Sequence, residues 1–304
     1  MHPIFDVVHS TTYRYSRPVS FGPHRVMYRP RASHDIRVLA SDLKVSPHAK
    51  QYLVQDVFSN SVALVQPLEA ATELRIVCSF TIEHAGSFNL ELPMDAQAIS
   101  YPFSYAASDR LDLEHYLRPH YADPDGVVQN WARQFVRPSL ATDGSGAIVM
   151  PNSRQILVDM THHIKNGLRY ASRDEEGTQT PAQTLVLGSG SCRDYALLMM
   201  EAARRLGYAC RFVSGYLYDP ALDRVAAEGE AVVGAGATHA WVQVYLPGPG
   251  WVAFDPTNAF FGGTNLIRVA TARDPSQASP ISGSWDGEPG DYLGMEVEVM
   301  VRRR

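Results

Sequence analysis

The chain has 304 residues, of which 45% are hydrophobic and 19% are charged, and its formal net charge is −5. At roughly 150 residues per domain this length predicts two domains, and the apolar content excludes an intrinsically disordered chain. Acidic and basic residues are spread over both halves of the chain. No half is strongly basic, so no nucleic-acid partner is predicted.

Three cysteines, Cys78, Cys192 and Cys210, are too few and too far apart for a disulfide framework or a zinc site. A reducing compartment fits this usage. The first residues lack a basic stretch followed by an apolar one, so no secretory signal is expected. No window approaches the run of about 18 apolar residues that a membrane helix needs. We therefore expect a cytoplasmic protein with no cofactor, no metal and no membrane association.

The first hundred residues have the composition of short β-strands separated by turn-prone clusters. Runs rich in β-branched and aromatic residues occur at 5–15, 36–45, 52–58, 61–67 and 74–83. Strands at this spacing predict an all-β, sandwich-like or barrel-like domain over residues 1–120. The prolines between Pro93 and Pro124 interrupt the pattern and suggest the domain boundary.

Residues 121–304 change to helices followed by strands, which is typical of an α+β fold. Apolar residues at helical spacing predict helices over 125–136, from the N-cap Asn152 to Gly167, and over 196–206. Strand patterns follow at 209–218, 240–246 and 251–254, and the tail alternates as a last strand at 295–301.

Cys192 occurs where a glycine-rich turn enters a helix. Ser191 and Asp194 form an S-x-x-D capping box, which places Cys192 at the first helical position. The unpaired backbone N–H groups and the positive dipole end at such a position stabilise a thiolate, the nucleophilic form of cysteine. The alternative is a small buried apolar side chain at a helix start.

A thiol nucleophile needs a base, and the base needs an acceptor that orients it. His239 begins an apolar strand, and Asp255 ends the next one, after a Pro-Gly-Pro-Gly turn at 247–250. Hairpin pairing of these strands could bring the two side chains together. Trp241 is assigned to the core, on the face opposite to His239.

These motifs resemble those of the bacterial transglutaminase-like superfamily. The segments 190–196 and 205–208 resemble its cysteine motif, 238–241 its histidine motif and 250–257 its aspartate motif, and 12–16 resembles the N-terminal domain that precedes this core. The spacing also matches, with 47 residues from Cys192 to His239 and 16 from His239 to Asp255.

The resemblance implies a papain-like α+β core over about residues 150–270. Cys192 would be the nucleophile, His239 the general base and acid, and Asp255 the residue that orients His239. The shared chemistry is attack on an amide or acyl carbonyl through a thioester, completed by water or by an amine. The resemblance favours a cysteine protease or amidase over a protein cross-linker, with a peptide or protein as substrate. It also suggests association with peptide-ligating ATP-grasp proteins.

The resemblance leaves open the second oxyanion donor and the choice between an enzyme and a binding module. The backbone N–H of Cys192 is one natural oxyanion donor, and Gln183, by analogy with papain-type enzymes, is a candidate for the second. The competing function is a binding module that keeps the fold without turnover. The presence of all three residues, Cys192, His239 and Asp255, argues for the enzyme.

Overall fold

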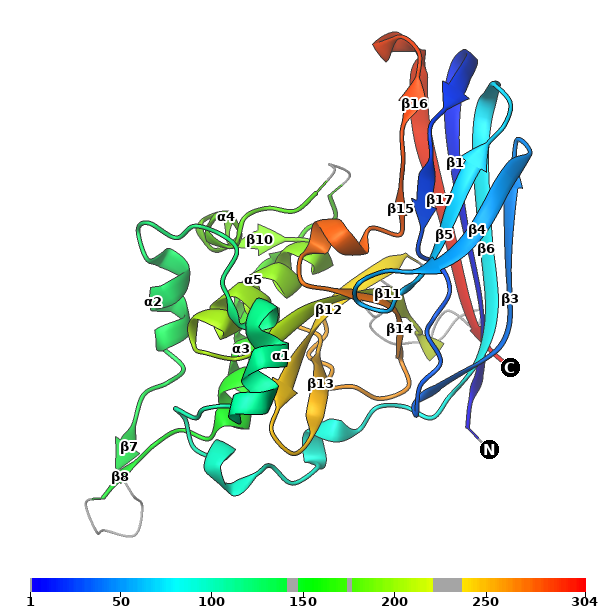
Figure 1. The fold of residues 1–304 in the computed structure, drawn as a ribbon. Coiled ribbons are helices and arrows are strands. Elements are labelled where there is room, and N and C mark those ends of the chain that lie inside the picture. The colour runs from blue at the N-terminus through cyan, green and yellow to red at the C-terminus, as the bar shows by residue number, and fades with distance from the viewer. Residues whose placement is uncertain (1, 141–146, 174–176, 221–236) are drawn as a thin grey trace.

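The computed structural model describes residues 2–140, 147–173, 177–220 and 237–304. It has an α+β fold with a β-rich N-terminal region, as predicted (Figure 1). The helices are α1 (Ala107–Leu117), α2 (Val127–Arg133), α3 (Ser153–Gly167), α4 (Pro181–Leu187) and α5 (Cys192–Arg205). Among the described residues, 3₁₀ turns span Asn89–Glu91, Ala96–Ala98, Pro275–Ala278 and Pro289–Asp291.

The N-terminal region is a sandwich of two antiparallel sheets. One sheet has the order β16 (Trp285–Asp286), β1 (Ile4–Phe21), β6 (Ala71–His84) and β3 (Ile36–Ser46), with β17 (Tyr292–Arg303) also paired to β1. The other has the order β15 (Ile281–Ser282), β2 (His24–Val26), β5 (Ser61–Pro67) and β4 (Ala49–Gln55). Alternating apolar residues such as Tyr15, Val65 and Ile76 fill the space between the sheets.

The tail of the chain returns to this sandwich. β17 pairs with β1 from Tyr292 opposite Tyr15 to Arg303 opposite Phe5, and the two termini lie close together in Figure 1. β15 and β16 join the same sandwich through β2 and β1. The sequence placed these residues in the second domain, but their backbone hydrogen bonds join them to the first.

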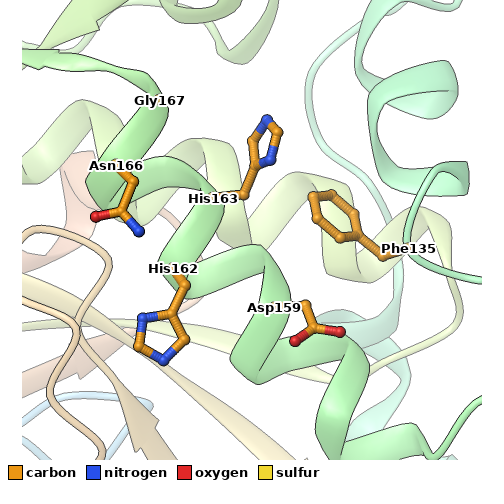
Figure 2. Close-up of a pocket in the computed structure, with 6 residues that line it drawn as sticks. All are labelled: Phe135, Asp159, His162, His163, Asn166 and Gly167. Carbon is orange, nitrogen blue, oxygen red and sulfur yellow. The ribbon is translucent and has the colours of Figure 1, made fainter.

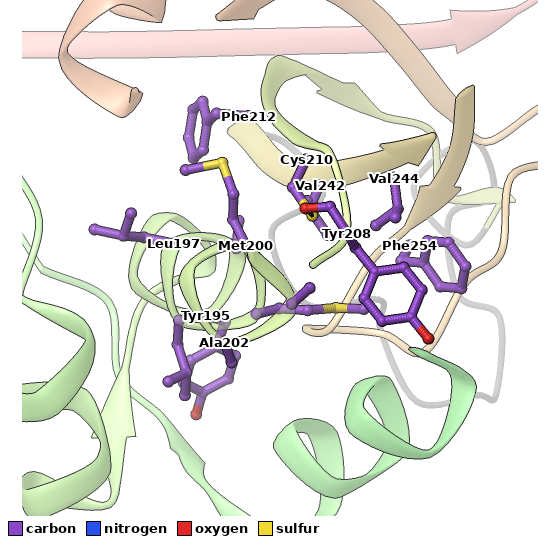
Figure 3. Close-up of a cluster of buried hydrophobic side chains, with 14 of the residues drawn as sticks. Tyr195, Leu197, Met200, Ala202, Tyr208, Cys210, Phe212, Val242, Val244 and Phe254 are labelled. Atoms are coloured by element: carbon purple, nitrogen blue, oxygen red, sulfur yellow. Dashed lines mark hydrogen bonds between the residues drawn. The ribbon is translucent and has the colours of Figure 1, made fainter. Parts of the chain in front are cut away.

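The second region is built on an antiparallel sheet in the order β13 (Gly250–Phe254), β12 (Thr238–Leu246), β11 (Cys210–Leu217) and β14 (Leu266–Ala272). Short strands lie outside it in two pairs of described residues: β7 (Ser139–Leu140) pairs with β8 (Ile148–Val149), and β9 (Arg169–Tyr170) with β10 (Ser189–Gly190). α5 packs on this sheet through a large apolar cluster that includes Met200, Phe212, Val242 and Phe254 (Figure 3).

The end of α5 is fixed by a buried charge network. The Glu201 carboxylate accepts hydrogen bonds from the guanidinium groups of Arg204 at 2.8 Å and Arg205 at 3.0 Å, and from the backbone N–H groups of His120 and Tyr121. Arg204 also donates to the carbonyl oxygens of Tyr116, Cys210 and Arg273. The network therefore ties the end of α1, the segment that follows it, the start of β11 and the residue after β14 to the end of α5. Arg205 also pairs with Asp123, so the buried charges balance.

The two regions meet through polar and apolar contacts on β11 and β14. Asn60 donates to the carbonyl oxygen of Thr271 at 2.7 Å and accepts from its N–H at 2.9 Å, so its carboxamide caps the edge of β14. Arg268 pairs with buried Asp35 at 3.1 Å. An apolar cluster with Phe5, Phe80, Tyr216 and Ile267 among its members completes the contact.

Candidate active site

Cys192 is the first residue of α5, as the capping pattern predicted. Ser191 is the N-cap in an extended conformation, and the Asp194 carboxylate accepts from both the N–H and the hydroxyl of Ser191 at 2.8 Å. Cys192 is 7% exposed. Its side chain thus lies at the end of the helix where backbone N–H groups lack intrahelical acceptors and the dipole favours negative charge.

Asp194 does more than cap the helix. Its fully buried carboxylate also accepts from the backbone N–H of Gln179 at 2.7 Å and from the guanidinium of Arg173 at 2.9 Å. Gly190 makes room for this cluster, because a Cβ there would lie 2.9 Å from the Cβ of Asp194. The segment before α4 is therefore held against the turn that presents Cys192.

His239 and Asp255 form a buried pair. The Nε2 atom of His239 lies 2.8 Å from Oδ2 of Asp255, and neither side chain is exposed. The other ring nitrogen, Nδ1, is buried and has no hydrogen-bond partner among the described residues. The imidazole therefore has one nitrogen bound to a carboxylate and one available, which is the arrangement a general base requires.

The electrostatics of this pair favour a charged imidazole. Burial alone would lower the pKa of His239, but the charge and hydrogen bond of Asp255, together with Cys192 nearby, raise it to about 10. Burial would likewise raise the pKa of Asp255, yet His239, the Asn258 amide and the Thr257 N–H lower it. Asp255 is thus the counter-ion that keeps an imidazolium stable in a buried site.

A tight turn holds the Asp255 carboxylate in place. Oδ1 accepts from the N–H of Thr257 at 2.9 Å, and Oδ2 accepts from the side chain of Asn258 at 3.0 Å as well as from His239. The backbone of Asp255 pairs with Phe260 across the turn. The Asp-Pro-Thr-Asn sequence therefore forms a turn and also supplies two of the hydrogen-bond donors that fix the carboxylate.

Trp241 was assigned to the wrong face. Residues two apart on a strand share a face, and the Trp241 ring stacks on His239 with centroids 6.0 Å apart and planes at 27°. Gly215 pairs with His239 across β11 and β12, and a Cβ at Gly215 would lie 2.8 Å from the Trp241 ring. Trp241 is therefore a second orienting contact for His239, which its spacing from the histidine could have revealed.

Gln183 has a local role at the start of α4. Its side-chain oxygen accepts from the N–H of Thr180, and its own N–H donates to the Thr180 hydroxyl, so the two residues form a capping box. Gln183 is exposed. The role of Gln183 as an oxyanion donor stays a prediction. In the structure its carboxamide oxygen is bound to the Thr180 N–H, on its own helix.

A shallow cavity of about 400 Å³ lies on the outer face of α3, lined by Phe135, Asp159, His162, His163, Asn166 and Gly167 (Figure 2). None of the three candidate catalytic residues lines it. The adjacent histidines contact different partners: His162 meets Phe261, and His163 meets Trp131 and Phe135. In the part of the chain that the structure describes, no group of three metal-ligating side chains occurs.

Together, the β sandwich, the antiparallel sheet and the cysteine that opens its central helix define a transglutaminase-like fold. Residues 5–83 match the bacterial transglutaminase-like N-terminal region, and residues 150–256 match the transglutaminase-like superfamily. Both regions therefore match family models of the transglutaminase-like type, in the order that the motifs predicted.

Full-length relatives and a solved structure agree with this assignment. An uncharacterized protein of Mycobacterium leprae is 26% identical over 296 residues, which cover 96% of this chain and 97% of that protein. One of Mycobacterium tuberculosis is 27% identical over 315 residues, with coverage of 97% and 92%. A candidate cysteine protease from Cytophaga hutchinsonii has a similar fold, with a TM-score of 0.69 at 19% identity, covering 99% of this chain and 91% of that chain.

Within residues 2–140, 147–173, 177–220 and 237–304, no helix is long and apolar enough to span a membrane.

Proposed function

We propose that this chain is a thiol-dependent acyl-transfer enzyme that cleaves amide bonds, with peptides as the substrate class. The observation that carries the proposal is the buried His239–Asp255 pair, whose free ring nitrogen lies beside a cysteine at a helix start. The solved relative described as a candidate cysteine protease supports hydrolysis over cross-linking. Because a nucleophilic thiol works in its reduced form, we also propose that the protein acts in the cytoplasm.

The reaction follows from the roles of the three residues. The thiol proton of Cys192 passes to Nδ1 of His239, and the thiolate attacks the carbonyl carbon of the amide. The imidazolium then gives its proton to the departing amine, and a thioester remains on Cys192. Water, deprotonated by His239, attacks the thioester and releases the carboxylic acid with the thiol restored. Asp255 keeps the imidazole oriented and balances its positive charge throughout.

The first test is site-resolved alkylation with iodoacetamide, read by mass spectrometry after brief exposure. Cys78 and Cys210 are controls within the same molecule, because both are buried and burial raises the pKa of each thiol to about 12. We expect Cys192 to react below pH 7, far faster than either control, and to lose this advantage in His239→Ala. Equal reactivity of all three cysteines would favour a binding module without turnover.

The second test separates hydrolysis from transfer. A peptide library is incubated with the enzyme in the presence and absence of a primary amine, and the products are identified by mass. We expect cleaved peptides whose new carboxyl ends carry no amine, and no products with Cys192→Ala. Amine incorporated into the products would make the enzyme a transamidase.

A further inference from the structure

An amide-cleaving thiol enzyme needs donors for the oxygen that becomes negative when the carbonyl is attacked. As the first residue of α5, Cys192 has a backbone N–H with no intrahelical acceptor, which supplies one donor. A second donor must approach the sulfur from outside the helix. Gln183 points its carboxamide oxygen back to Thr180, so another residue has to be considered.

Tyr170 lies beside the turn that leads into Cys192. It belongs to β9, which runs parallel to β10 and pairs Tyr170 with Gly190, two residues before the nucleophile. The hydrogen bonds from the N–H of Arg169 to the oxygen of Gly188 and from the N–H of Ala171 to the oxygen of Gly190, both 2.9 Å, bracket Tyr170. Its backbone is thus fixed relative to the start of α5.

The ring of Tyr170 is held but not enclosed. It meets the ring of Tyr195, in the first turn of α5, edge to face with centroids 6.2 Å apart. Tyr170 is 36% exposed, whereas Tyr195 is 2% and Cys192 is 7% exposed. Tyr170 therefore offers a polar group that a bound substrate can reach next to the thiol.

Burial, and then the charges around it, keep the Tyr170 phenol protonated. Burial raises the pKa of Tyr170 to about 12, and Cys192 is the next largest contribution, with Asp255 adding to it. A neutral phenol at this place can donate a hydrogen bond to a bound substrate.

We propose that the Tyr170 hydroxyl is the second oxyanion donor of the site, a catalytic role that rests on the proposed function. As the bond between Sγ of Cys192 and the carbonyl carbon forms, the π electrons of the carbonyl move to its oxygen. That oxygen accepts hydrogen bonds from the Cys192 N–H and the Tyr170 hydroxyl, with no proton transferred. When the carbonyl forms again, the amine leaves with the proton from His239, and both donors are free.

Two reactions of the same thiol test this role. Iodoacetamide alkylates Cys192 by displacement of iodide and forms no oxyanion, whereas p-nitrophenyl acetate acylates Cys192 through a tetrahedral oxyanion. We expect Tyr170→Phe to slow acetyl transfer to Cys192 by about 100- to 1,000-fold and to leave the alkylation rate as in the wild type. Tyr195→Phe is the matched control, since it removes a phenol hydroxyl from the same ring pair, and we expect it to change neither rate.

Each other outcome overturns the proposal. If Tyr170→Phe is acetylated as fast as the wild type, the hydroxyl is no oxyanion donor. If alkylation falls in parallel with acetylation, Tyr170 acts on the thiolate or on the fold. If Tyr195→Phe loses as much acetylation as Tyr170→Phe, the ring pair matters only for packing.

The same experiment separates this inference from the proposed function. A wild type whose Cys192 is neither alkylated faster than Cys78 and Cys210 nor acetylated contradicts both. A wild type that is acetylated at Cys192, beside an equally active Tyr170→Phe, contradicts only the role of Tyr170.

Discussion

Gly215 offers a direct test of how the sheet supports the candidate catalytic histidine. Gly215 lies on β11 opposite His239, at the irregularity where β11 pairs with β14. A Cβ at Gly215 would lie 2.1 Å from the carbonyl oxygen of Ile267 and 2.8 Å from the Trp241 ring. Ordinary contact begins near 3.4 Å, so Gly215→Ala requires the two strands to part by about 1.3 Å. The obstacle is a backbone atom in a β ladder, which cannot rotate away.

The expected cost is therefore at the upper end of overpacking effects, about 3 kcal/mol of the free energy of unfolding. The displaced Trp241 ring also releases His239, so alkylation of Cys192 by iodoacetamide should slow. Urea unfolding and the alkylation rate of the folded protein measure the two effects. Gly290→Ala is the matched control, because a Cβ at Gly290 has no heavy atom within 4 Å. If Gly215→Ala unfolds at the same urea concentration as this control, the packing argument is wrong.

Three further predictions concern the charged groups. Asp255→Asn removes the charge that, against burial, raises the pKa of His239 to about 10, so the imidazolium should lose its proton at lower pH. We expect the alkaline limb of kcat/KM for amide cleavage to move to lower pH. An unchanged alkaline limb would contradict the ion pair. Asp194→Asn removes a carboxylate that binds four donor groups beside the nucleophile, and we expect a loss of about 3–5 kcal/mol in urea unfolding together with slower alkylation of Cys192. Glu201→Gln breaks the buried network with Arg204 at a similar cost of about 3–5 kcal/mol, but the folded protein should keep wild-type alkylation of Cys192, because this network lies at the other end of α5.

Local patterns predicted the parts of the fold that depend on neighbours in the sequence. The N-cap at Asn152 and the capping box at Ser191 appear as expected, because capping joins residues two or three positions apart. The adjacency of His239 and Asp255 also follows from a short hairpin, whose turn fixes the register. These are the features on which the site geometry depends.

Features that depend on distant contacts were missed. α1 buries only Leu113, so its sequence shows no apolar stripe at helical spacing. The alternation of β17 predicted a strand, but its local sequence does not indicate its partner, β1, which lies almost 290 residues earlier in the chain. The stacking of Trp241 on His239, in contrast, follows from local alternation, because residues two apart on a strand share a face.

The return of the last strand to the first sheet has a mechanical consequence. The chain leaves the sandwich at the end of β6 and re-enters it at β15, so the region that holds Cys192 and His239 is an insertion with two covalent tethers to one body. A region on a single linker can swing about it, but two tethers close a loop and remove most of that freedom. The Asn60–Thr271 and Asp35–Arg268 contacts restrain what is left. We therefore expect the two bodies to stay together while a substrate binds at Cys192.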